Sequence, residues 1–191
     1  REIGEGITPS TDWEGVQKEE GLTKEEMSLL RAWVNPVYLQ TECTDSVRKY
    51  FCSNNSVQLK DFLKADKAAE ILAASKAADK EDGVGGGVAP SSYVTGTSDD
   101  KNRPGTGWTL TGPPHKRRFV SFDSSVAEEL SEEQGRIPTS TTTKRHSVVC
   151  GGLLDKCRHD LMESVAFAKL LRKLAYVCPI AYRNDVRRFR P

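Results

Sequence analysis

The chain has 191 residues, of which 37% are hydrophobic and 29% charged, and its formal net charge is +1 at neutral pH. Its mean hydropathy is −0.55, and no apolar run approaches the roughly 20 residues that cross a bilayer, which argues against a membrane protein. The near-neutral balance argues against a whole-domain footprint for nucleic acid, because the cations gather only in local islands.

The first predicted element is a helix that begins at Lys24. Residues 1–21 are polar and have no sustained apolar period, so we interpret them as a linker. The run Thr23-Lys24-Glu25-Glu26 then forms a capping box, in which each end satisfies a backbone amide of the other. The helix is expected to carry Met27, Leu30 and Trp33 inward and to end before Asn35-Pro36, because the residue before proline avoids the α region.

Two more helices are expected before residue 79. Thr44 is interpreted as the cap of a short helix that ends at residues 53–56 and carries Val47, Tyr50 and Phe51 on one face. Val57–Leu59 is predicted to be a brief strand. Residues 65–78 are rich in Ala, Lys and Glu, which predicts a third helix. Its small face is expected to pack closely against a partner and consists of Ala65, Ala68, Ala69 and Leu72.

Two low-complexity insertions are predicted, at 79–107 and 123–146. Both are rich in Gly, Ser or Thr and hold too little apolar surface to offset the entropy of ordering. Between them Trp108 and Leu110 alternate as in a strand, and a Gly112-Pro113-Pro114 turn follows.

The last part of the chain is predicted to form two helices and two strands. The helices span 148–162 and 165–177 with a break near Glu163-Ser164, and the strands cover 180–182 and 186–189. Cys150 and Cys157 fall on the apolar stripe of the first of these helices. We therefore interpret them as buried, reduced thiols rather than ligands of a metal.

Four segments, in order, resemble the second domain of the two-domain, iron- and 2-oxoglutarate-dependent protein prolyl hydroxylases. They are Trp33–Leu39, Leu59–Leu72, Trp108–Phe119 and Leu153–Pro191. The resemblance implies an α+β fold, namely the helical N-terminal part of a degenerate double-stranded β-helix (jelly roll) whose further strands lie beyond Pro191. It also implies that residues 1–21 link the catalytic domain to a partial domain at 22–191, and we expect the chain to be a fragment.

The resemblance also implies a role. The family hydroxylates a proline of a small-subunit ribosomal protein, and its second domain is non-catalytic. The cofactors Fe(II), 2-oxoglutarate and ascorbate then belong to the parent enzyme, and none is expected in this chain. The implied partners are the catalytic domain of the same protein and regulatory or ribosomal proteins. With no signal peptide at the N-terminus, we expect an intracellular protein, cytoplasmic or nuclear.

The residues themselves supply no catalytic set. An oxygenase of this kind holds iron with a His-x-Asp/Glu pair and a distant His, but no carboxylate follows two positions after His115, His146 or His159. A Gly-x-Ser-x-Gly elbow is also missing. No catalytic, cofactor-binding or metal-binding residue is therefore assigned.

A basic segment is the candidate partner-binding site. It consists of Lys116, Arg117 and Arg118, which follow the stiff Gly-Pro-Pro turn. The plainer alternative is a solvated surface, since dispersed charge is the usual surface design. Two functions stay open: a non-catalytic domain of a prolyl hydroxylase, and a stand-alone scaffold or regulatory module without enzymatic activity.

Overall fold

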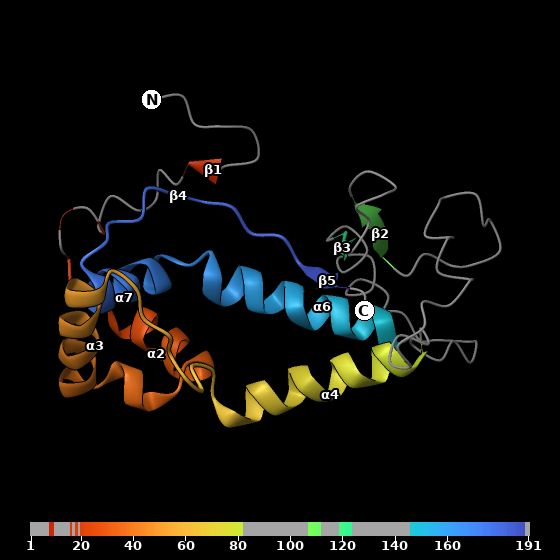
Figure 1. Cartoon of the computed structure of the whole chain (residues 1–191), viewed down its shortest axis with the longest axis horizontal. Helices are drawn as coiled ribbons and strands as arrows, with labels where there is room; N and C mark the ends of the chain where they lie inside the picture. Colours follow the sequence, from red (N-terminus) through yellow and green to blue (C-terminus); the bar gives the residue numbers. More distant parts are fainter. Residues whose placement is uncertain are drawn as a thin grey trace. The chain divides into compact units, whose positions relative to one another are not determined.

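The computed structural model describes residues 8–9, 16, 18, 20–81, 107–111, 119–123 and 146–189. Helices dominate, and two small antiparallel sheets accompany them (Figure 1), so the predicted α+β class is confirmed. The double-stranded β-helix stays a prediction, because the described strands form one two-stranded and one three-stranded sheet. Within the described ranges, no helix combines the length and apolar content that crossing a membrane requires.

The chain divides into two compact units with separate cores. The first contains residues 1–68 and 157–184, and the second contains residues 69–156 and 185–191. The single domain at 22–191 and its boundary at residue 21 stay predictions.

Helix α2 (Lys24–Trp33) begins in the first unit at the predicted residue. The Glu26 amide donates to Thr23 Oγ1 at 3.2 Å, and the Thr23 amide donates to Glu26 Oε2 at 2.7 Å, so the capping box is confirmed. Leu30 and Trp33 are buried. The helix ends at Trp33, and the 3-10 helix η2 (Pro36–Leu39) follows.

Helix α3 (Thr41–Asn54) corrects two predictions. Thr44 is not a cap: it is buried inside the helix, and its hydroxyl donates to the Thr41 carbonyl at 2.9 Å. A threonine hydroxyl can bond the preceding turn instead of a following amide. The helix begins at Thr41, four residues earlier than a Thr44 cap predicts. Tyr50 is exposed rather than part of an inner face. The predicted end at residues 53–56 is confirmed, with Asn55 in the left-handed region at φ 57°.

The predicted strand at Val57–Leu59 is wrong, because these residues are irregular. Their β-branched and apolar content gave a strand signal, but the bridge to Val34 forms further along, at Leu63. Strand pairing depends on a partner, which local propensity does not specify.

Helix α7 (Val165–Ala175) follows the π-helix η5 (Arg158–Met162), and the break at 163–164 is confirmed. The Ser164 hydroxyl caps α7 by accepting from the Phe167 amide at 3.1 Å. Figure 1 shows α7, in blue, beside α2 and α3, and it packs against both. It ends at Ala175, two residues earlier than predicted, because Tyr176 adopts the left-handed conformation that ends many helices.

The expected linker makes structured contacts with the first unit. Strand β1 (Thr8–Pro9) pairs antiparallel with strand β4 (Ala181–Tyr182). Val16 is fully buried and packs in a small core with Ala168. Part of residues 1–21 therefore belongs to the packing of this unit.

The second unit joins a helix pair to a three-stranded sheet. Helix α4 (Ala65–Glu81) starts in the first unit and continues into the second, where it runs antiparallel to α6 (His146–Cys157), as Figure 1 shows in yellow and cyan. Ser75 Oγ lies 3.7 Å from Cys150 Sγ, and Glu81 Oε2 accepts from the Ser147 amide at 2.9 Å. The sheet has the order β2-β3-β5, from β2 (Trp108–Thr111), β3 (Phe119–Phe122) and β5 (Arg187–Phe189).

The edges of both predicted insertions are ordered. Helix α4 extends through Glu81, three residues into the first insertion, and α6 begins at His146, inside the second. The Asp123 amide donates to the Gly107 carbonyl at 2.7 Å, which joins the two remaining edges. The bounds 79–107 and 123–146 were therefore too wide, and the interiors of both segments lie outside the described residues.

The small face predicted for the third helix is exposed. Leu72 is 55% exposed, and the three alanines at 65, 68 and 69 are exposed as well. The apolar period marked this face as an inner one, but the buried residue of α4 is Ala78. Packing of the face against a partner stays a prediction.

Candidate functional site

The predicted basic segment Lys116, Arg117 and Arg118 lies outside the described residues, and so does His115. The structure places the other two histidines at the surface. His146 is the exposed first residue of α6, and the His159 side chain is 55% exposed in η5.

The surroundings of His159 do not fit an iron centre. Its Nδ1 lies 3.0 Å from Glu163 Oε2, and the other carboxylate oxygen accepts from Arg158 Nη1 at 3.1 Å. Both oxygens of Glu163 are therefore paired, and Arg158 brings a positive charge to the place where a cation would sit. Among the described residues, no group of three or more His, Cys, Asp or Glu side chains could hold a metal ion. The donor set here does not match a two-histidine, one-carboxylate triad.

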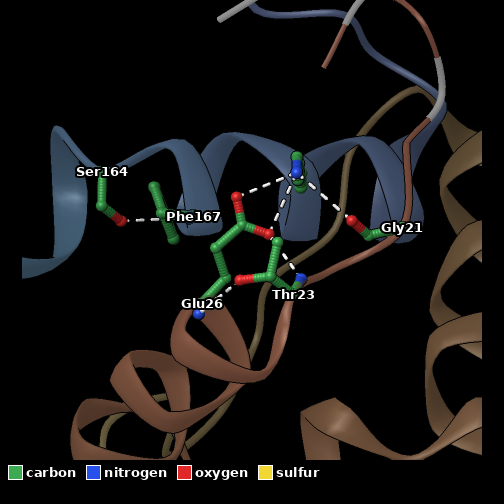
Figure 2. A network of polar contacts seen from close by, with 6 residues as sticks. Gly21, Thr23, Glu26, Ser164 and Phe167 are labelled. Carbon is green, nitrogen blue, oxygen red and sulfur yellow. Dashed lines mark hydrogen bonds and ion pairs between the residues drawn. The ribbon is translucent and has the colours of Figure 1, made fainter. Parts of the chain in front are cut away.

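A buried cation at the centre of α7 forms the main polar site of the first unit (Figure 2). Lys169 Nζ lies 2.9 Å from Glu26 Oε1 and 3.0 Å from Oε2, and it donates to the Gly21 carbonyl at 3.2 Å. The lysine side chain is 7% exposed and the glutamate side chain 18%. A buried charge is stable only when an opposite charge lies close to it and its hydrogen-bond donors have acceptors.

Glu26 thus serves two parts of the fold at once. Its Oε2 closes the capping box on the Thr23 amide, and the same carboxylate neutralises Lys169 on another helix. One turn further along α7, Arg172 Nη1 donates to the Val16 carbonyl. We name this set of contacts the N-terminal clamp. Its members are Val16, Gly21, Glu26, Lys169 and Arg172.

The clamp attaches two positions that precede α2 to helix α7. Two backbone carbonyls, at positions 16 and 21, accept from cations of α7, and the fully buried Val16 side chain packs with Ala168. These contacts therefore hold Val16 and Gly21 against α7.

Sequence reasoning missed the clamp, although one signal was available. Lys169 lies among Ala166, Ala168 and Leu170, all buried on α7. A lysine inside an apolar stripe is rarely fully buried unless it is paired. This position therefore predicts a carboxylate partner, but the sequence does not say which one.

In the first unit, the residues that resemble the prolyl hydroxylase family hold the fold. The Asn35 amide donates to the Phe62 carbonyl at 2.8 Å, and its side-chain amide donates to the Asp61 carbonyl at 3.0 Å. The rings of Tyr38 and Phe62 lie 5.4 Å apart, and Phe167 of α7 continues the row at 6.1 Å. These contacts join three segments of the resemblance.

The same holds in the second unit. Trp108 Nε1 donates to the Ser147 carbonyl at 2.8 Å, and the guanidinium of Arg188 lies 5.1 Å from the Trp108 ring centroid. Arg188 Nε also lies 3.5 Å from Asp79 Oδ1. The tryptophan and the terminal arginine, far apart in the sequence, therefore meet at one sheet. Their side chains make internal contacts rather than an open site.

The predicted burial of Cys150 and Cys157 is confirmed, and all five cysteines are free thiols. Burial raises the pKa of the Cys157 thiol, and the Asp160 carboxylate raises it further. A raised pKa keeps the thiol protonated and poorly nucleophilic.

Comparison with known proteins identifies the family. The profile of a family described as the oxoglutarate and iron-dependent oxygenase degradation C-terminal domain matches residues 25–191. The chain belongs to this family. It is 31% identical over 163 residues to a prolyl 3,4-dihydroxylase of Ostreococcus tauri, covering 85% of the chain and 27% of that relative. It is 23% identical over 109 residues to a prolyl 3-hydroxylase of Mus musculus, covering 57% of the chain and 15% of that relative.

The chain thus spans about a quarter of the algal relative and less of the mouse one. The predicted relationship to prolyl hydroxylases is confirmed at the level of the family.

Proposed function

We propose that this chain is a non-catalytic C-terminal domain segment of a 2-oxoglutarate- and Fe(II)-dependent prolyl hydroxylase. In this proposal it stabilises the enzyme or binds its partners, and the iron, the 2-oxoglutarate and the ascorbate are held by a separate catalytic domain. We also propose that the protein acts inside the cell, in the cytoplasm or nucleus.

One observation carries the proposal. The side chains through which the chain resembles the family, such as Asn35, Tyr38, Trp108 and Arg188, make internal contacts in the two units. Catalytic groups face an open site where a substrate can reach them. Residues whose hydrogen bonds and ring contacts join segments of the same fold are typical of a supporting domain.

The donor chemistry agrees with this role. The Glu163 carboxylate is paired with both His159 and Arg158. Oxygenases of this class need open positions at the iron for oxygen and cosubstrate.

The N-terminal clamp supports the proposed partner. It attaches Val16, Gly21 and Glu26 to α7 through Lys169 and Arg172. In a two-domain enzyme, this is where a catalytic domain would be joined, so the clamp would set the direction in which that domain leaves.

We further propose that the substrate is a prolyl residue of a small-subunit ribosomal protein, as the family resemblance implies. This part rests on the resemblance and on the names of the relatives, which are prolyl hydroxylases.

The test begins with the coding sequence upstream of Arg1. We expect it to encode a His-x-Asp pair and a distant His. The protein read from it should add one oxygen atom to a prolyl peptide, as followed by mass spectrometry. A reading frame that starts close to Arg1, or an upstream region without such a triad, would favour a stand-alone scaffold instead.

A further inference from the structure

An exposed apolar segment follows helix α7 in the first unit. Tyr176 is 68% exposed, Val177 41% and Ile180 65%, so three large apolar side chains face solvent within five residues. Tyr176 also has a φ of 56°, a backbone region that bulky residues rarely adopt. We name Tyr176, Val177 and Ile180 the α7–β4 ledge.

The ledge is held in place by helix α3. The guanidinium of Arg48 lies 4.9 Å from the Tyr176 ring centroid, and Arg48 Nε donates to the Lys173 carbonyl at 2.8 Å. Asp45 Oδ1 lies 3.5 Å from Arg48 Nη1 and orients it. One arginine therefore fixes both the last turn of α7 and the ring that follows it. An aromatic side chain that is ordered before binding loses little entropy when a partner covers it.

The charge around the ledge is mainly positive, and the Asp45 carboxylate beside it is paired with Arg48. No Asp or Glu occurs between Glu163 and Asp185, whereas this stretch contains four cations, at positions 169, 172, 173 and 183. Lys169 is neutralised inside the fold by Glu26. Lys173 and Arg183 are exposed, and so is Lys49 of α3, next to Arg48. The apolar segment thus lies in a cationic setting.

We propose that the α7–β4 ledge binds an acidic segment of another protein, which places an aliphatic or aromatic side chain on Tyr176, Val177 and Ile180 while its carboxylates face Lys173 and its neighbours. Exposed apolar groups rimmed by charge mark interaction surfaces. Complementary charge selects the partner and speeds the encounter.

Two other occupants fit less well. A nucleic acid strand needs free aromatic faces on which bases stack, but one face of Tyr176 is covered by Arg48, and the other ledge residues are aliphatic. A second copy of the chain would bring one cationic ledge against another, which costs binding energy.

This inference goes beyond the proposed function, because it concerns a surface that does not depend on whether a catalytic domain precedes the chain. The probe is a short acetylated peptide in which leucine alternates with glutamate, titrated into the isotope-labelled 191-residue chain. We expect NMR shifts at Tyr176, Val177 and Ile180. A matched peptide with lysine in place of glutamate should cause none.

Variants sharpen the test. Ile180→Ser and Lys173→Glu should each weaken binding by about tenfold or more. The matched control Leu72→Ser removes an equally exposed apolar side chain from α4 and should leave the affinity within about twofold. Far-UV circular dichroism of each variant checks that the fold is retained.

Four results would overturn the proposal: shifts that spread away from the ledge, equal binding of the lysine peptide, equal loss in Leu72→Ser, or ledge shifts caused by a single-stranded RNA but not by the acidic peptide. Concentration-dependent dimers that Ile180→Ser abolishes would assign the ledge to self-association and also contradict it.

Discussion

Lys169 carries a charge into the interior of the first unit, and Glu26 is the carboxylate that makes this possible. The two side chains are 7% and 18% exposed, and their atoms meet at 2.9 Å. Removing one partner of a buried pair leaves an unpaired charge, which costs far more than the pair itself contributes.

Glu26→Gln is therefore expected to destabilise the chain by about 2–3 kcal/mol. Glutamine at this position keeps the capping box, so the loss reports on the unpaired Lys169. Adding Lys169→Met should recover much of it, because the buried charge is then gone. Urea unfolding followed by circular dichroism measures the cycle. Additive effects of the two substitutions would show that the pair is not coupled.

The cysteines differ in their reach to solvent. Cys52 and Cys178 are exposed, whereas Cys150 and Cys157 are buried. A thiol reagent at neutral pH should modify the two exposed cysteines first and the two buried ones only on unfolding. Fast modification of all five thiols in the folded chain would contradict the predicted burial.

Cys157 is expected to make the stability of the fold depend on pH. Burial raises the pKa of its thiol above the ordinary 9.0, so the folded state holds the proton more tightly than the unfolded state. The resulting stability is fully present below the unfolded pKa and is lost as the pH rises through the folded pKa. Cys157→Ala should flatten the fall in melting temperature above about pH 9. An equally steep fall in that variant would remove Cys157 as the cause.

At the scale of elements, helix α6 meets strand β3 at a glycine. A Cβ added to Gly151 would lie 2.1 Å from Cε2 of the buried Phe122 ring, whereas one added to Gly152 would have no neighbour within 4 Å. The two adjacent positions therefore form a matched pair.

Gly151→Ala should destabilise the chain by about 1–3 kcal/mol, because the buried ring must move. Gly152→Ala should stabilise it by up to about 1 kcal/mol, since alanine is the better helix former. Thermal unfolding of both variants measures the two changes in stability. If the two substitutions change the stability in the same direction, the contact of the Phe122 ring with Gly151 of α6 is contradicted.

Helices α2 and α7 pack together, and Trp33 is the largest buried side chain of α2. Trp33→Ala should cost about 3–5 kcal/mol. Replacing Lys116, Arg117 and Arg118 with alanine should leave folding nearly unchanged if these side chains are exposed. Melting temperatures compare the two variants. An equal loss in both would make the basic segment structural and end its interpretation as a partner site.

Local signals in the sequence predicted helices well and their contacts poorly. The capping box at Thr23 involves residues three apart, so the sequence alone contains it. The prediction that Thr44 is a cap was wrong because the same hydroxyl can cap a helix or bond the preceding turn, and packing decides which of the two it does. The strand predicted at Val57–Leu59 was wrong because a strand needs a pairing partner. The predicted strand at Trp108 and Leu110 is present, and its partner strand is close along the chain.

The contacts that matter most are the most distant ones. Lys169 and Glu26 are 143 residues apart, and the α7–β4 ledge depends on an arginine of another helix. Nothing in the local pattern names these partners, because the fold alone brings them together. The segments of the family resemblance include Lys169 and Tyr176 but not their partners Glu26 and Arg48.

At the scale of the whole molecule, the chain forms two small units and belongs to an oxygenase C-terminal family. The residues through which it resembles that family support the fold. We propose that the chain does no oxygenase chemistry by itself.

Anaerobic titration of the purified 191-residue chain with iron(II), followed by a succinate-release assay with 2-oxoglutarate and oxygen, tests this claim most directly. The account predicts no stoichiometric iron binding and no succinate above the protein-free rate, because the described histidines and carboxylates do not form a triad. Stoichiometric iron binding with iron-dependent release of succinate by the pure chain would contradict it.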